Sequence, residues 1–173
     1  MAIILGIDPG SRFTGIGVIE NDGYKSRHLY HTCLKLGNGA MPQRLGNIYK
    51  GIIEVIEAYS PTLMSIERVF VSKNAATALK LGQARGVAIC AGVMHHLEIH
   101  EYAPREVKQA VVGTGAAQKS QVEHMTKILL NLHGQLQEDA ADALGIALCH
   151  AHTSAFQKKI NYQLQYQNKK GRK

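Results

Sequence analysis

The stretch GIDPGSRFTGIGVIE at residues 6–20 decides the fold, because it places a charged residue where a buried strand meets a sharp turn. The apolar run at residues 2–7 predicts an interior strand, and Pro9 and Gly10 bend the chain directly after it. Asp8 therefore stands at the C-terminal end of that strand. An aspartate before such a turn commonly caps its own loop, so a chemical role for Asp8 needs partners from elsewhere in the sequence.

Apolar periodicity predicts the elements that follow this stretch. Short, turn-rich links between the first three strands favour an antiparallel meander, and the later alternation of strand and helix is typical of an α/β fold. We therefore expect a mixed five-stranded sheet flanked by helices. The strands are predicted at residues 2–8, 13–20, 24–34, 62–71 and 98–102, and the helices at 41–59, 74–96, 104–112, 119–132 and 138–152.

The length of 173 residues suits one compact domain, which we place at residues 1–152. The net charge of +7 is unevenly distributed, since six of the 20 basic residues and no acidic residue follow position 150. Residues 153–173 therefore form a basic polar tail that we expect to be flexible. Two basic segments in the nearly neutral body, at residues 68–97 and 105–119, favour a surface that meets phosphates, although a merely solvated face is the alternative.

The composition also indicates the cellular compartment in which the protein is expected. The longest charge-free apolar run, residues 86–97, is too short to span a bilayer, and the N-terminus does not resemble a signal peptide. The three cysteines, Cys33, Cys90 and Cys149, are odd in number and lack metal-binding spacing, which indicates reduced thiols. We predict a cytoplasmic protein that does not enter the membrane.

Four of the 13 acidic residues stand where acids are not expected. Asp8 and Glu67 each close an apolar strand, and the C-terminal ends of parallel neighbouring strands share one edge of a sheet. Asp139 and Asp142 are three residues apart on the last predicted helix, so both lie on one face. Structural alternatives exist, because Asp139 can cap its helix or interact with the helix macrodipole, and Glu67 can pair with Arg68, Arg85 or another base.

If these four carboxylates converge, their charges repel, and one or more must keep a proton unless a cation is present. Mg²⁺ prefers oxygen ligands and keeps coordination places for water and phosphate. A carboxylate set without organised His or Cys selects Mg²⁺, with Mn²⁺ as the alternative, over zinc. Two such ions can activate a water and stabilise the leaving oxygen of a phosphodiester. The pattern therefore predicts a metal-dependent hydrolase of phosphodiesters.

Small residues recur at a spacing of four in the helix predicted at 74–96, at Gly82, Gly86, Ala84, Ala88 and Gly92. This spacing lets another backbone approach closely. The approaching backbone could belong to the core of the same chain or to the second copy in a dimer.

Four segments of the sequence resemble the RuvC family of bacterial Holliday-junction resolvases: GIDPGSRFTGIGVIE, IERVFVSKNAATALKLGQARGVA, YAPREVKQAVVGTGAAQKSQV and DAADALGIALCH. They follow the family's order within residues 2–152. The resemblance implies a ribonuclease-H-like fold, a homodimer, and paired, symmetric, Mg²⁺-dependent cuts in a four-way DNA junction that leave ligatable nicks. It also implies a role in recombination and repair and a partnership with the RuvA–RuvB branch-migration complex.

The family's acidic constellation falls on Asp8, Glu67, Asp139 and Asp142, so the resemblance implies that these residues are catalytic and bind the metal, with two ions per site. Phe70 matches the family's aromatic wedge near the junction centre. An aromatic ring there can stack on an unpaired base, although an ordinary apolar strand residue is the alternative.

Four basic residues are expected to contact DNA. Lys108 and Lys119 fall in matching motifs and are expected to face the phosphates near the scissile bond. Lys73 and Arg85 belong to the first basic segment of the body.

Two other classes of protein remain as alternatives. A junction-binding protein without cleavage activity would share the basic segments, but four carboxylates at a phosphate-binding surface oppose DNA unless metals neutralise them. A sugar-kinase or actin-like ATPase also has Asp and Gly beside its first turn, yet it needs two large domains. The loop GTGAAQKS at residues 113–120 lacks the glycine directly before the lysine that a nucleotide-binding P-loop requires.

Overall fold

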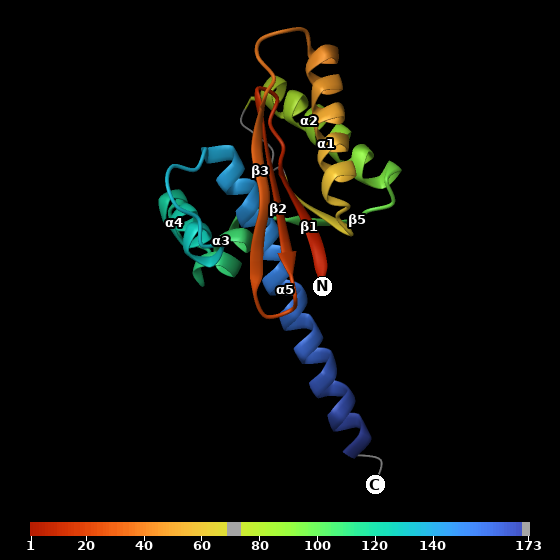
Figure 1. Ribbon diagram of the computed structural model, residues 1–173, viewed down its shortest axis with the longest axis vertical. Coiled ribbons are helices and arrows are strands. Elements are labelled where there is room, and N and C mark those ends of the chain that lie inside the picture. Colours follow the sequence, from red (N-terminus) through yellow and green to blue (C-terminus); the bar gives the residue numbers. More distant parts are fainter. Residues whose placement is uncertain (69–73, 171–173) are drawn as a thin grey trace.

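The computed structural model describes residues 1–68 and 74–170, with side chains described up to residue 155. Within these residues, a single sheet has the strand order β3-β2-β1-β4-β5 (Figure 1). β1 pairs antiparallel with β2, β2 pairs antiparallel with β3, and β4 lies parallel to both β1 and β5. The mixed five-stranded sheet is therefore confirmed. The strands are β1 (Ala2–Asp8), β2 (Phe13–Asn21), β3 (Ser26–Lys35), β4 (Leu63–Glu67) and β5 (Glu98–Tyr102).

Helices cover both faces of the sheet. On one face, α1 and α2 pack over a core that includes Leu5 and Ile7 of β1. On the other face, α3, α4 and α5 pack over a second core that includes Ile4 (Figure 1). The side chains of β1 alternate between the two cores because successive strand residues point to opposite faces. The helices are α1 (Met41–Tyr59), α2 (Ala75–Met94), α3 (Pro104–Val112), α4 (Lys119–Leu129) and α5 (Glu138–Lys170).

Glycines on β1 and β2 bring α5 unusually close to the sheet. A Cβ atom added at Gly6 would overlap with the main-chain oxygen of Ala143, and one added at Gly15 would overlap with that of Asp139. A Cβ atom at Gly17 would lie 2.8 Å from Leu144. At Gly6 and Gly15 the backbone of α5 therefore rests directly on the backbone of β1 and β2, and at Gly17 the side chain of Leu144 packs against the strand.

Three elements end three or more residues away from their predicted ends, and the other boundaries agree within two residues. β4 ends at Glu67, whereas the predicted strand continued to residue 71, and α4 ends at Leu129 instead of residue 132. The left-handed backbone of Asn131, with φ of 51°, does not continue a helix. α5 runs to Lys170, past its predicted end at residue 152, and projects beyond the sheet (Figure 1). No glycine or proline interrupts the sequence between Gly145 and Gly171, so nothing local stops this helix.

None of the helices in the described part of the chain is both long enough and apolar enough to cross a bilayer.

Candidate active site

Two of the predicted acids end neighbouring parallel strands. Ile7 of β1 is in register with Ile66 of β4, and each is followed by an acid, Asp8 or Glu67. The turn after Asp8 is closed by Thr14, whose hydroxyl donates to the main-chain oxygen of Gly10 at 2.8 Å. Among the side-chain hydrogen bonds of the described residues, none involves the Asp8 carboxyl. The interpretation of Asp8 as the cap of its own turn is therefore not supported by the structure.

The first turn of α5 brings the other two acids to the same place. Asp8 pairs with Gly15 across the β1–β2 ladder, and Gly15 lies directly beneath the main chain of Asp139. Asp142 follows one turn later. The charges of Glu67, Asp139 and Asp142 all act on Asp8 and raise the pKa of its carboxyl, so Asp8, Glu67, Asp139 and Asp142 lie close together. We call these four residues the acid cluster.

Asp8 lies at the electrostatic centre of the acid cluster. Burial, followed by the charges of Glu67, Asp142 and Asp139, raises the pKa of Asp8 to about 8 from an ordinary value of 3.8. Lys119 opposes this shift without cancelling it. At neutral pH the protein therefore holds this carboxyl largely in its protonated form when no additional cation is present.

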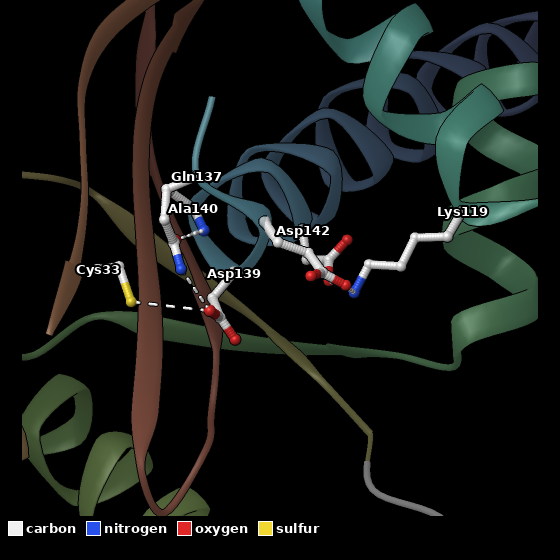
Figure 2. Close-up of polar contacts among 7 residues, drawn as sticks. Cys33, Lys119, Gln137, Asp139, Ala140 and Asp142 are labelled. Carbon is white, nitrogen blue, oxygen red and sulfur yellow. Dashed lines mark hydrogen bonds and ion pairs between the residues drawn. The ribbon is translucent and has the colours of Figure 1, made fainter. Parts of the chain in front are cut away.

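The pKa values of Glu67 and Asp142 are also raised, in both cases first by burial. The Nζ atom of Lys119, on α4, lies 2.6 Å from Asp142 and 2.7 Å from Glu138 (Figure 2). Burial alone would lower the pKa of Lys119, but its bonds to these two carboxylates raise it above its ordinary value. The ammonium group of Lys119 thus stands beside the acid cluster and partly neutralises it.

Asp139 is held by two neutral groups. The Sγ atom of Cys33, on β3, donates to Oδ2 of Asp139 at 3.7 Å, and the Nε2 atom of Gln137 donates to the same oxygen at 2.6 Å (Figure 2). The cap of α5 is Gln137, whose Oε1 atom accepts the main-chain N–H of Ala140 at 3.0 Å. The interpretation of Asp139 as a helix cap is therefore wrong, and its carboxylate remains available to the acid cluster.

The donor chemistry of the acid cluster fits a hard divalent cation, because it offers carboxylate oxygens and a buried excess of negative charge. Within the described residues, however, no three His, Cys, Asp or Glu side chains are already placed to hold a metal ion. Asp142 is instead turned toward Lys119. Side-chain rotation must therefore accompany the binding of an ion.

The predicted DNA contacts have different surroundings. Lys108 is half-buried on α3. Arg85 is bound within the chain: its Nη2 atom lies 2.6 Å from Glu101, and its Nε atom donates to the main-chain oxygen of Glu67 at 3.1 Å. Arg85 thus ties α2 to the ends of β4 and β5, and the DNA contact predicted for it stays a prediction.

Two predicted contacts, Phe70 and Lys73, lie outside the described residues. Nothing in the described part of the chain bears on either prediction.

Sequence reasoning missed three residues around the acid cluster: Cys33, Gln137 and Glu138. Gln137 offered a signal, since it directly precedes the predicted helix and occupies the capping position. Cys33 offered none, because its contact with Asp139 joins residues 106 positions apart.

Comparison with known proteins identifies the relatives of this chain. The model of the family described as "Crossover junction endodeoxyribonuclease RuvC" matches residues 4–150. The crossover junction endodeoxyribonuclease RuvC of Xanthomonas axonopodis pv. citri is 54% identical over 167 residues, which cover 95% of this chain and 96% of that relative. The protein of the same description from Xanthomonas oryzae pv. oryzae is 58% identical over 157 residues, or 90% of either chain.

Solved structures agree with this result. The structure described as Thermus thermophilus RuvC in complex with Holliday junction substrate matches with a TM-score of 0.85 and 31% identity, covering 90% of this chain and 96% of that one. The Thermus thermophilus RuvC structure matches with a TM-score of 0.82. These matches confirm the predicted ribonuclease-H-like fold.

Proposed function

Because the chain belongs to the RuvC family of crossover junction endodeoxyribonucleases, we propose that it resolves four-way (Holliday) DNA junctions by paired, symmetric, metal-dependent hydrolysis of phosphodiesters. The observation that carries the proposal is the convergence of the partly buried acid cluster, which raises the pKa of Asp8 to about 8. Carboxylates crowded in this way repel one another and destabilise a folded protein unless they bind a cation.

The acid cluster is the proposed catalytic and metal-binding group. Nucleases of this family are metal-dependent, and the oxygen-only donor set supports Mg²⁺, or Mn²⁺ in its place, with two ions per site. Such ions supply an activated water and neutralise the developing charge on the leaving oxygen. The protein's own part is to hold Asp8 and Glu67 on rigid strand ends and to hold Asp139 and Asp142 against them through α5.

The basic residues near the acid cluster support DNA binding. Lys119 places a positive charge where an approaching phosphate would otherwise meet carboxylates alone. The proposed contacts of Lys108, Lys73 and Arg85 with phosphates, and of Phe70 with a base, rest on the family resemblance and the charge pattern. Mapping the contacts in a complex of this chain with a four-way junction tests these proposals.

The exposed side of α2 supports the proposed homodimer. Ala84, Ala88 and Gly92 face the core, whereas a Cβ atom added at Gly82 or Gly86 would meet open space. The small residues on one side of α2 thus pack in the core of the same chain, and those on the opposite side are accessible to a second copy of the chain. The outward side carries an uncharged row at helical spacing, which we call the α2 stripe: Leu79, Gly82, Gly86, Cys90 and Val93.

A second copy of the chain is the occupant that we propose for the α2 stripe. The side chains of Leu79 and Val93 are 65% and 54% exposed, although both are apolar. The two glycines between them let a second helix approach closely, as in other packings of small residues. A two-fold dimer also provides the two acid clusters that paired cuts in opposing strands need.

Charging the α2 stripe is expected to dissociate the dimer. In the double variant Leu79→Glu, Val93→Glu, two carboxylates would be buried against their symmetry mates, which costs several kcal/mol. Light scattering should show twice the chain mass of 18.9 kDa for the unmodified protein and the chain mass itself for the variant. The control Gln43→Glu places a charge on the exposed surface of α1 and should remain dimeric. A dimeric double variant would remove the α2 stripe from the interface.

Cleavage is expected to require Mg²⁺ and no nucleotide. The test uses a synthetic immobile four-way junction with labelled strand ends, incubated with the protein in Mg²⁺ or in EDTA. Symmetric nicks in two opposing strands that ligase can seal are expected in Mg²⁺, and a loss of at least about 10³-fold is expected in EDTA. Binding without nicks in Mg²⁺ and in Mn²⁺ would favour the alternative, a junction-binding protein without cleavage activity.

The proposal includes two further elements. The family resemblance supports cooperation with a RuvA–RuvB branch-migration complex, which would deliver junctions to the dimer. A cytoplasmic location is supported by the three free thiols, Cys33, Cys90 and Cys149.

A further inference from the structure

The side chain of Gln137 makes two hydrogen bonds that serve different purposes. Its Oε1 atom accepts the main-chain N–H of Ala140 at 3.0 Å, which satisfies a free donor in the first turn of α5. Its Nε2 atom donates to Oδ2 of Asp139 at 2.6 Å. The two ends of one amide group thus connect the start of the helix with a member of the acid cluster (Figure 2).

Helix capping alone does not explain a glutamine at this position. Ser, Thr, Asp and Asn are the residues that cap helices best, and each caps through a side-chain oxygen. A capping oxygen from Ser or Asp leaves no amide N–H for a carboxylate two residues later. The amide of Gln137 performs the capping with its oxygen and keeps its nitrogen for Asp139.

Cys33 donates to the same oxygen from another element. Its Sγ atom lies 3.7 Å from Oδ2 of Asp139 and belongs to β3, an edge strand of the sheet (Figure 2). Both donors are neutral, so they orient the carboxylate without supplying the positive charge that would compete with a cation. Among the hydrogen bonds and ion pairs of the described residues, none involves Oδ1 of Asp139.

We propose that Gln137 and Cys33 are positioning residues that fix Oδ2 of Asp139 and thereby reserve Oδ1 for the metal ion. This inference rests on the proposed metal-dependent function of the acid cluster. Partners that orient a metal-binding carboxylate typically change metal affinity by about 10- to 100-fold. Gln137, an amide donor at 2.6 Å, is the stronger partner, since a thiol is a weak donor.

The test compares two substitutions at position 137 that separate orientation from capping. Gln137→Ser keeps a capping oxygen on a shorter side chain and removes the amide that donates to Asp139, whereas Gln137→Met removes both the capping oxygen and the amide. Mn²⁺ binding is measured without DNA, from the electron paramagnetic resonance signal of the free ion. Both variants should bind Mn²⁺ about 10-fold more weakly than the unmodified protein, and only Gln137→Met should also lower the melting temperature.

The matched controls lie close to the same site. Gln135→Ser changes an exposed glutamine in the preceding loop and should leave Mn²⁺ affinity unchanged. Cys33→Ala should weaken Mn²⁺ binding about two- to threefold, as expected for the loss of one weak hydrogen bond. In cleavage assays, Gln137→Ser should need about 10-fold more Mn²⁺ for half-maximal rate and should recover the full rate at saturating Mn²⁺.

The outcomes separate this inference from the function on which it rests. Equal Mn²⁺ affinity for the unmodified protein and Gln137→Ser would overturn the positioning role and leave the metal-dependent function intact. Failure of the unmodified protein to bind Mn²⁺ would overturn the metal-dependent function and the inference together. A cleavage rate of Gln137→Ser that stays low at saturating Mn²⁺ would also contradict the proposal, because it would indicate damage beyond the orientation of Asp139.

Discussion

Asp8→Asn is expected to reduce the rate of strand cleavage by about 10³-fold or more, while the affinity for the junction is retained. Asparagine has almost the same shape as aspartate but offers one neutral oxygen in place of a carboxylate. The acid cluster would lose its most buried charge and with it the attraction for a divalent cation. Nicking of a synthetic junction in Mg²⁺ measures the loss, and a gel shift in EDTA measures binding. Cleavage at the unmodified rate would refute the assignment of Asp8.

The same variant is expected to be more stable than the unmodified protein when no metal is present. The pKa of Asp8 is about 8 in the fold and 3.8 ordinarily, so between about pH 4 and pH 8 the folded protein holds a proton that the unfolded chain has released. The stability of the metal-free protein therefore falls as the pH rises through this window. Asp8→Asn removes that contribution, so its melting temperature at pH 8 should exceed that of the unmodified protein by several degrees.

Addition of Mg²⁺ supplies the corresponding control. A cation that binds the folded state stabilises it by mass action, so Mg²⁺ should raise the melting temperature of the unmodified protein more than that of Asp8→Asn. An equal effect of Mg²⁺ on the two proteins would contradict a metal site at Asp8, whatever the cleavage assay shows.

Gly15→Ala is expected to reduce cleavage by about 100-fold although it touches no acidic side chain. Its new methyl group would overlap with the main-chain oxygen of Asp139, and the first turn of α5 must move to relieve the overlap. A displacement of about 1 Å within a catalytic group costs about 100-fold in rate. Overpacking of this kind also costs about 1–3 kcal/mol of unfolding free energy. Calorimetry and the junction assay measure the two effects.

The control for this prediction is Gly46→Ala on the exposed side of α1, where an added Cβ atom meets open space. Because alanine favours a helix more than glycine, this variant should be more stable by about 1 kcal/mol and fully active. A folded Gly15→Ala protein with unmodified activity would show that α5 can move without disturbing the acid cluster.

The sequence predicted the acid cluster because each member stands at a position that local pattern defines. Asp8 and Glu67 interrupt apolar strands at their ends, and strand ends of parallel neighbours meet by geometry. Asp139 and Asp142 follow from helical spacing. The support around these acids was not predictable in the same way, because the contacts of Cys33 with Asp139 and of Lys119 with Asp142 depend on how distant elements pack.

The sheet and the number of elements were predictable from periodicity, whereas some boundaries were not. The end of α4 depends on the left-handed turn at Asn131. Residues 119–132 contain no glycine or proline that would mark this end in the sequence. The two sides of α2 were also indistinguishable before packing was known, because small residues such as Ala84 and Gly86 alternate along it. Tertiary contacts decided which side faces the core.

The backbone contact between α5 and the two central strands has a consequence for substitutions in the domain. Because Gly6 and Gly15 bring main chain against main chain, the height of the helix above the sheet does not depend on the volume of any side chain at these points. A change of side-chain size in either core is therefore expected to displace the acids less than an added side chain at Gly6 or Gly15, which would lift the helix directly from the sheet.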